Sequence, residues 1–223
     1  GSVTVTETED IDWINNWKQY FHQFYIDDLL VIPSWEEVKE EDKDKKILHI
    51  DPGTAFGTGM HETTQLCIRQ IKKHLTDTTE LLDVGTGSGI LAILALMYGA
   101  KHAVGTDLDP CAVEAVAQNM EANGIPVQDF EMMIGNIITD REVQDRVGYA
   151  CYDIVVANIL ADVLVPLTPV IVHQLKKGGI YITSGIINDK ENVVRKAVED
   201  AGLEILEVTY QGEWVSVTAR KNA

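Results

Sequence analysis

The sequence is short of cysteine, and it lacks an apolar run long enough to cross a membrane. Its three cysteines, Cys67, Cys111 and Cys151, lie far apart and form no CxxC pair. Isolated thiols of this kind are typical of a reducing compartment, so we expect a cytoplasmic protein without a metal site. A membrane-spanning helix needs about 20 consecutive apolar residues. The sequence contains no such stretch, and we therefore expect no membrane partner.

Positive charge is also scarce. The 223 residues carry 18 Lys and Arg against 35 Asp and Glu, which gives a formal net charge of -17. A field of this sign repels nucleic acid and attracts basic partners, although many acidic surfaces serve only solubility. We therefore expect a basic protein partner and no direct contact with nucleic acid.

Strand-like and helix-like patterns alternate over most of the chain. The expected strands of the main sheet are 80–85, 102–109, 129–135, 152–160, 178–185, 203–211 and 213–221. The expected helices are 63–75, 89–99, 110–124, 141–146, 162–175 and 188–202. This alternation predicts an α/β fold, a mostly parallel seven-stranded sheet with helices on both faces. Only a turn joins the last two strands, so they form a C-terminal hairpin and one of them must run antiparallel to the rest.

The amino-terminal part differs from this pattern. Residues 1–10 are polar and are typical of a tag remnant or linker. Aromatic residues recur at helical spacing over 11–26 and predict an amphipathic helix, which is followed by a short strand that begins at Leu29 and stops at Pro33. We expect residues 11–45 to form a lead-in that packs on the core, and residues 46–223 to form the main domain.

The stretch LLDVGTGSGIL, residues 81–91, places three glycines directly after a predicted strand. Their spacing is G-x-G-x-G, at Gly85, Gly87 and Gly89. A dinucleotide fingerprint, G-x-G-x-x-G, would need a further glycine at position 90, and a P-loop would need Gly-Lys-Ser or Gly-Lys-Thr. Asp83, just before the loop, would repel a pyrophosphate. These departures disfavour an NAD enzyme.

A ligand with an amino group, a carboxylate and a ribose suits the loop better, and S-adenosylmethionine carries all three. The free amides at the start of the helix after Gly89 favour a carboxylate. Asp83 can hold the amino group through nearby amides or waters. Asp107 ends the next strand, 22 residues after Gly85, where an acid binds both ribose hydroxyls. The alternative is a tight turn followed by a helix cap at Asp107 or Asp109.

Two further loops carry candidate site residues. Asn136, after the third strand, can contact the adenine, although a simple polar turn is an equal alternative. The stretch DPGTAFGTGMHETT, residues 51–64, has more glycines than a helix start needs, and it can fold over a ligand as a lid. Thr64 can present its hydroxyl to the methionine end, and His61 can contact a substrate amine. The alternative is a plain turn with Thr63 as the helix cap.

Five segments together resemble the bacterial ribosomal protein L11 methyltransferase family: AFGTGMHETT, LLDVGTGSGILAI, VGTDLDPCAVEAVAQN, VVANILADVL and EWVSVTARK. The similarity covers nearly everything from Trp13 onward. The resemblance implies a Rossmann-like class I S-adenosylmethionine-dependent methyltransferase fold. It also implies methylation of lysine side chains and the N-terminal amine of a basic large-subunit ribosomal protein, L11. The implied cofactor contacts are Thr64, Gly85, Asp107 and Asn158.

The chain departs from the family pattern in two places. The family usually reads Gly-Thr-Gly-Thr-His-Pro-Thr-Thr, whereas Met60 and Glu62 replace a threonine and a proline here. Both flank the expected lid, in which Phe56 and Gly57 are substrate candidates. The family also carries a small N-terminal substrate-recognition domain, and this chain begins near the linker that follows that domain. We therefore expect the catalytic domain alone, as a monomer.

Asn158 lies at the end of the fourth strand, within the run Ala-Asn-Ile-Leu. Methyltransferases that act on bases often carry Asn/Asp-Pro-Pro-Tyr/Phe there, and the aromatic stacks on a flipped base. The amide is kept here and the aromatic is not, which argues against a nucleic-acid target. Asn158 is therefore the candidate catalytic residue, accepting a hydrogen bond from the acceptor amine, and a strand-end amide that satisfies a turn is the alternative. Two other functions stay open: methylation of another protein or small amine, and a module that binds S-adenosylmethionine without turnover.

Overall fold

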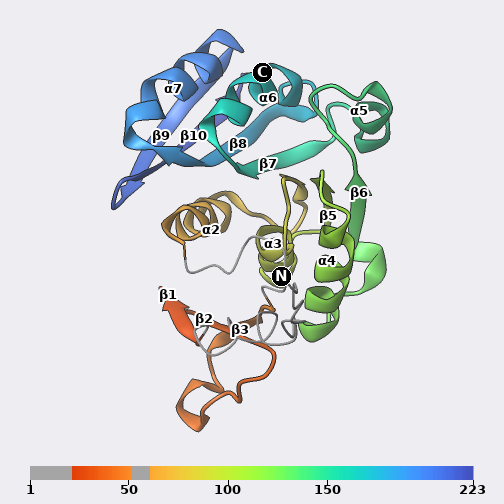
Figure 1. The fold of residues 1–223 in the computed structure, drawn as a ribbon, viewed down its shortest axis with the longest axis vertical. Coiled ribbons are helices and arrows are strands. Elements are labelled where there is room, and N and C mark those ends of the chain that lie inside the picture. Colours follow the sequence, from red (N-terminus) through yellow and green to blue (C-terminus); the bar gives the residue numbers. More distant parts are fainter. Residues whose placement is uncertain (1–21, 52–60, 223) are drawn as a thin grey trace, which may run out of the picture.

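The computed structural model describes residues 22–51 and 61–222, which form two sheets with helices around them (Figure 1). The small sheet consists of β1 (Phe24–Ile26), β2 (Leu29–Ile32) and β3 (Lys46–His49). The large sheet consists of β4 (Glu80–Val84), β5 (His102–Asp107), β6 (Phe130–Ile134), β7 (Tyr152–Asn158), β8 (Leu175–Ile187), β9 (Leu203–Gln211) and β10 (Trp214–Lys221).

The described helices are α2 (Glu62–His74), α3 (Ile90–Met97), α4 (Cys111–Ala122), α5 (Arg141–Val147), α6 (Ala161–Ile171) and α7 (Glu191–Asp200). Short 3-10 turns occupy Glu40–Asp42 (η2), Val127–Asp129 (η3) and Asn188–Lys190 (η4). Among the residues described, no helix combines the length and the apolar character that a membrane span requires.

The large sheet has the predicted mixed topology. Its strand order is β6-β5-β4-β7-β8-β10-β9, and the pairs from β6 through β8 are all parallel. Strand β10 is antiparallel to both β8 and β9, so the predicted hairpin is confirmed and β10 is its reversed strand. The chain leaves β4 toward β5 on one side and returns to β7 on the other. A switch point of this kind opens a crevice at the carboxyl ends of the strands, where open α/β sheets bind ligands.

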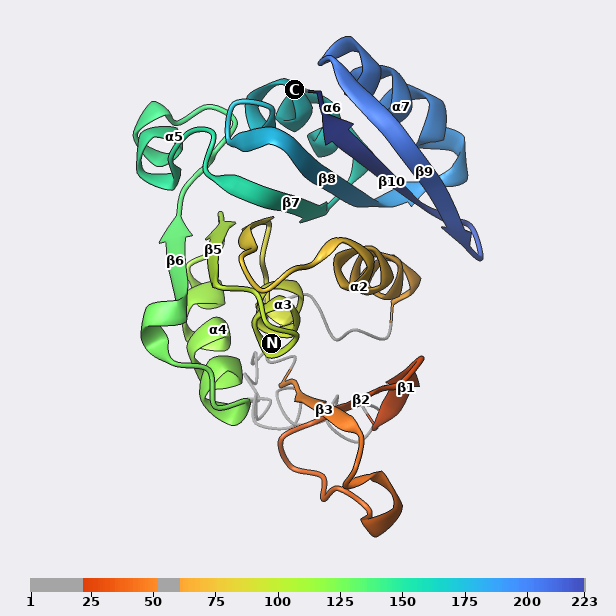
Figure 2. The same ribbon diagram turned by 180° about the vertical axis from the view of Figure 1, so that it is seen from behind.

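Two hydrophobic cores lie on opposite faces of the large sheet. Helices α2, α3 and α4 cover one face and α5, α6 and α7 the other, as Figures 1 and 2 show. Helix α3 reads ILAILALM and is buried over most of its surface, as expected of a helix that is apolar all round. The small sheet packs on the first core, where Val31 and Leu48 belong to the same cluster as Ile68 of α2.

Two sequence predictions are wrong at their boundaries. Residues 24–26 were expected to end the amphipathic helix over 11–26, but they form β1 and pair with β2, because aromatic and β-branched residues suit a strand equally well. The rest of that expected helix lies outside the described residues. Leu175 was expected in the helix over 162–175, but α6 ends at Ile171 and Leu175 pairs with Tyr152 of β7.

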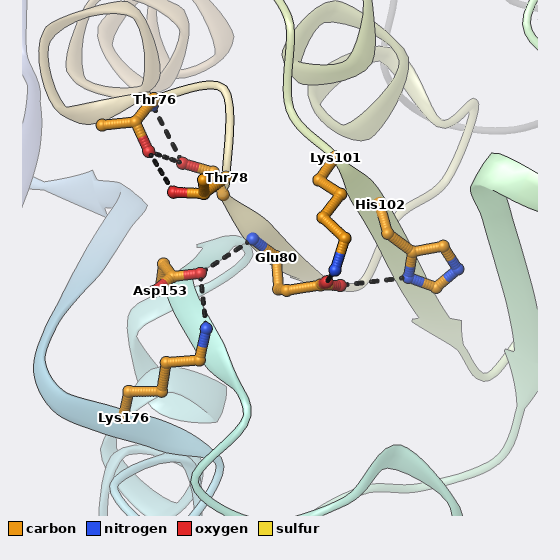
Figure 3. Close-up of polar contacts among 8 residues, drawn as sticks. Thr76, Thr78, Glu80, Lys101, His102, Asp153 and Lys176 are labelled. Carbon is orange, nitrogen blue, oxygen red and sulfur yellow. Dashed lines mark hydrogen bonds and ion pairs between the residues drawn. The ribbon is translucent and has the colours of Figure 1, made fainter.

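A polar cluster ties the strands together at the amino-terminal edge of the large sheet (Figure 3). The Asp153 carboxylate accepts hydrogen bonds from the Glu80 amide at 2.9 Å and from Lys176 Nζ at 2.8 Å. Glu80 in turn accepts from Lys101 Nζ at 2.8 Å and lies 3.5 Å from His102 Nδ1. Because these residues begin β4, β5, β7 and β8, the cluster fixes the edge opposite the ligand crevice.

Candidate active site

A cavity of about 880 Å³ opens at the carboxyl-terminal edge of the sheet. Its volume falls within the roughly 300–1,000 Å³ that is usual for small-molecule sites. Its wall includes the predicted site residues His61, Gly85, Gly87, Asp107, Asn136 and Asn158. Residues from four strand ends and from the start of α2 therefore meet at the switch point.

The glycine loop adopts a conformation that favours glycine at each of the three positions. The φ angles of Gly85, Gly87 and Gly89 are +72°, +53° and +80°, all in the left-handed region. A Cβ on Gly85 would lie 2.6 Å from Cγ2 of Ile159, so the loop and the end of β7 approach too closely for any side chain. Gly89 precedes α3 and faces Val116 and neighbouring core side chains rather than the cavity, so its predicted cofactor contact stays a prediction.

Gly85→Ala should therefore weaken cofactor binding as well as stability. The positive φ alone costs about 1–2 kcal/mol, and the clash with Ile159 displaces the strand end that carries Asn158. Thermal unfolding and calorimetric titration with S-adenosylhomocysteine measure the two effects. Gly124→Ala is the matched control, because Gly124 has a similar φ of +64° and open space around its Cβ position. Equal losses of affinity in both variants would contradict a specific role for Gly85.

Asp83 is buried just beneath the loop and not on the cavity wall. Its Oδ2 accepts a hydrogen bond from Thr86 Oγ1 at 2.8 Å, and its Oδ1 has no hydrogen-bond partner among the described residues. Burial, with the nearby Asp107 charge adding to it, raises the pKa of Asp83 to about 7. The predicted hold on the cofactor's amino group is therefore indirect, through the loop.

This raised pKa gives the stability of the protein a testable pH dependence. The ordinary pKa of the group is 3.8, so between about pH 4 and 7 the folded state binds more protons at Asp83 than the unfolded state does. Its contribution to stability is therefore full at low pH and is lost as pH rises through this window. This loss of unfolding free energy is on the order of a few kcal/mol, and it should be absent in Asp83→Asn. Urea unfolding at several pH values across this window measures the free energy of unfolding. Asp77→Asn is the control, because Asp77 is exposed. If Asp83→Asn left the pH dependence unchanged, Asp83 would not be its source.

The sequence left two roles open for Asp107 and Asp109: binding a ribose and supporting the start of a helix. The Asp107 carboxylate accepts from the Gly87 amide at 2.8 Å and from the Asp109 amide at 2.9 Å. The Asp109 carboxylate accepts from the Cys111 amide at 2.9 Å, at the start of α4. Asp109 thus supports the helix start, and Asp107 is held half-buried on the cavity wall by the loop itself. A carboxylate can accept about four hydrogen bonds, so Asp107 retains acceptor capacity for a ribose diol.

Asn158 and Thr64 contact each other across 94 positions of sequence. Asn158 Nδ2 donates to Thr64 Oγ1 at 3.1 Å, which orients the Asn158 amide and leaves its Oδ1 as the acceptor that can serve a ligand. Asn158 is half-buried on the cavity wall, whereas Thr64 is buried behind it. The predicted contact of Thr64 with the cofactor stays a prediction. In the structure, Thr64 orients the Asn158 amide.

His61, not Thr63, is the residue before the first turn of α2. Helix α2 begins at Glu62, and the Thr63 amide donates to His61 Nδ1 at 3.3 Å. The same Nδ1 lies 2.9 Å from Thr63 Oγ1. The His61 ring also packs edge-to-face on Trp214, with centroids 4.8 Å apart. His61 lines the cavity, and its predicted contact with a substrate amine stays a prediction.

Asn136 serves a turn and also borders the cavity. Its Oδ1 accepts from the Ile138 amide at 3.0 Å, so the simple polar turn is present. Asn136 nonetheless lines the wall, as do Ile137, Ile138 and Leu108, which follows β5. This apolar region suits a flat heterocycle such as adenine.

Sequence analysis missed several wall residues. Leu108, Leu160, Gly185 and Trp214 all line the cavity. Leu108 and Leu160 each follow a strand end by one or two positions, a signal that was available but had no specific chemistry. Gly185 reaches the site because β8 lies beside β7, and Trp214 reaches it because β10 lies beside β8. The lid candidates Phe56 and Gly57 lie outside the described residues.

The wall residues fit S-adenosylmethionine. Gly85 and Gly87 bring the backbone of the glycine loop to the cavity wall, and Asp107 offers acceptors to a ribose. Leu108 and Ile137 supply apolar surface for adenine. Asp83 is buried beneath the loop and supports it through the hydrogen bond that it accepts from Thr86. Within the described ranges no group of three or more His, Cys, Asp or Glu is arranged to hold a metal ion.

Comparison with known proteins finds matches that cover nearly the whole chain, including all the cavity residues. A family model described as "Ribosomal protein L11 methyltransferase (PrmA)" matches residues 1–222. A ribosomal protein L11 methyltransferase of Agathobacter rectalis is 55% identical over 224 residues, which cover 99% of this chain and 69% of that protein. One from Lachnospira eligens is 56% identical over 222 residues, covering 99% and 70%. The crystal structure of a ribosomal protein L11 methylase from Lactobacillus delbrueckii subsp. bulgaricus has a TM-score of 0.80 at 32% identity, covering 91% of this chain and 100% of that chain.

Proposed function

The chain belongs to the ribosomal protein L11 methyltransferase family, and we propose that its cavity transfers a methyl group from S-adenosylmethionine to lysine and N-terminal amines of ribosomal protein L11. The observation that carries the proposal is that Asp107 and Asn158 line the same cavity. The first is a preoriented acceptor for a ribose, and the second is an oriented acceptor for an amine.

The reaction is a displacement at carbon. S-adenosylmethionine supplies a methyl group on a sulfonium: a bond forms from the amine nitrogen to that carbon, the carbon–sulfur bond breaks, and sulfur leaves as a neutral thioether. The protein contributes mainly alignment, an effect that can reach roughly 7–11 kcal/mol. Gly85 and Gly87 set how deeply the cofactor sits in the cavity. Asn158 Oδ1 accepts a hydrogen bond from one N–H group of the amine and so directs the amine's lone pair.

The acceptor lysine must lose its proton before its nitrogen can attack the methyl group. Its ordinary pKa is about 10.4, so it enters mostly as an ammonium. Apolar wall residues such as Ile159, Leu160 and Val163 disfavour the charged form and lower that pKa. The neutral amine then keeps a hydrogen bond to Asn158 while it attacks.

The substrate also agrees with the charge of the chain. A net charge of -17 attracts a basic ribosomal protein and speeds its encounter at low salt. A ribosomal protein substrate would place the reaction in the cytoplasm, and we propose that the enzyme acts there as a monomer.

The direct test is incubation of the chain with methyl-labelled S-adenosylmethionine and purified L11, followed by mass spectrometry of intact L11 and its peptides. The proposal predicts methyl groups on lysine or the N-terminal amine of L11. A second basic ribosomal protein serves as the control. Label on a small amine or another protein, with none on L11, would replace the proposed substrate. Cofactor binding without label on any acceptor would favour a binding module.

A further inference from the structure

Trp214 lies on the cavity wall although it comes from β10, far along the chain from the cofactor loops. It is the first residue of β10, directly after the turn of the β9–β10 hairpin, which reaches toward α2 in Figure 2. The indole is half-buried. The ring therefore presents apolar surface to the cavity while its backbone belongs to the sheet.

The backbone around Trp214 is held from several directions. Trp214 pairs with Ile187 of β8 and Gln211 of β9, and the Asn188 amide donates to the Glu213 carbonyl at 3.0 Å. Gln211 is in turn bound to α2, since its Oε1 accepts from Arg69 Nη1 at 2.7 Å. A tryptophan has only two side-chain torsions, so a ring on this platform loses little further freedom when a ligand packs on it.

The ring is placed next to the groups that face the acceptor amine. The His61 ring packs on Trp214 at 4.8 Å between centroids, with 66° between the planes. His61 starts α2, and Thr64 in the same turn accepts from Asn158 Nδ2. Trp214 contacts His61 and Asn158 contacts Thr64, both at the start of α2, and Trp214, His61 and Asn158 all line the cavity.

We propose that Trp214 determines specificity for the acceptor: its ring, with that of His61, forms the wall along which the methylene stem of an alkyl amine lies. The proposal rests on the proposed function, because it assigns the acceptor half of the same cavity. A lysine stem packs well against apolar surface while its nitrogen stays polar. The electron-rich face of an indole also attracts an ammonium, so the ring holds the amine before it loses its proton. Leu160, 70% exposed at the cavity rim, extends the apolar surface outward.

The test compares two ligands by calorimetry. One is S-adenosylhomocysteine, and the other is an analogue in which nitrogen replaces sulfur and carries a butylamine arm in the direction of the transferred methyl group. The arm should raise the affinity of the unmodified chain by about tenfold or more. Trp214→Ala should reduce that gain to less than about threefold, and Trp214→Phe should keep most of it. The affinity for S-adenosylhomocysteine should change by less than about threefold in both variants.

Tyr210→Ala is the matched control, because Tyr210 is an exposed aromatic of the same hairpin and lies outside the cavity wall. It should leave both affinities unchanged. The same gain from the arm in Trp214→Ala, or no gain in the unmodified chain, would overturn the proposal. An equal loss of affinity for both ligands in Trp214→Ala would also overturn it, since the ring would then support only the fold or the cofactor. An arm-dependent gain that needs Trp214, in a chain that leaves L11 unmodified, would keep the acceptor wall and reject only L11 as the substrate.

Discussion

Asn158→Ala should reduce methyl transfer at saturating S-adenosylmethionine by at least about 100-fold and leave the affinity for S-adenosylhomocysteine within about threefold. The reason lies in the 3.1 Å hydrogen bond from Asn158 Nδ2 to Thr64, which fixes Oδ1 as the group that orients the amine. Misplacing a reacting group by about 1 Å can cost 10²-fold in rate. Single-turnover transfer to L11 and calorimetric titration separate the two quantities.

Asn136→Ala is the matched control for this prediction. Asn136 borders the same cavity, but its Oδ1 serves the Ile138 amide in a turn. We expect its turnover to fall by less than about tenfold. A variant Asn158→Ala that turned over normally would refute the role of Asn158, and a parallel loss of cofactor affinity would make it a cofactor ligand only.

Asp107→Ala should lower the affinity for S-adenosylhomocysteine by about 100-fold or more. The variant removes the acceptors for a ribose diol, and it also leaves the Gly87 and Asp109 amides without the carboxylate that now accepts from them at 2.8 and 2.9 Å. Hydrogen bonds to charged groups contribute about 1.5–3 kcal/mol each, so losing two toward a ligand reaches this range. Calorimetry measures the affinity directly.

Asp109→Ala is the control here. Asp109 has the same charge and lines the same cavity, but its carboxylate accepts a hydrogen bond from the Cys111 amide. It should cost about 1 kcal/mol of stability, as the loss of a helix-start acceptor does, and less than about threefold in affinity. Equal losses in the two variants would show that the negative charge near the cavity matters and the position of Asp107 does not.

The cofactor half of the site was predictable because its determinants are local. Gly85 and Gly87 stand in a turn whose spacing excludes the dinucleotide pattern, and Asp107 ends the next strand. Adjacent parallel strands bring such ends together, and the 2.8 Å bond from Gly87 to Asp107 is the result. The sequence also allowed Asp107 or Asp109 to cap a helix; in the structure Pro110 is the N-cap of α4, and the Asp109 carboxylate before it accepts from the Cys111 amide.

The acceptor half depends on contacts that no local pattern records. Thr64 meets Asn158 because α2 crosses the carboxyl edge of the sheet, and Trp214 reaches the cavity because β10 inserts between β8 and β9. The hairpin itself was predictable, but not which side chain at its turn would face a ligand. At the amino-terminal end, the spacing of aromatic residues suited a helix, and the strand pairing of residues 24–26 prevailed over it.

The central claim is that the loop LLDVGTGSGIL holds an S-adenosyl ligand and not a dinucleotide. One calorimetric experiment tests it most directly: titration of the chain with S-adenosylhomocysteine, and separately with NAD. The account predicts saturable one-site binding of S-adenosylhomocysteine and no heat of binding from NAD. Binding of NAD without binding of S-adenosylhomocysteine would contradict the account, and no binding of either would reduce the glycine loop to a turn.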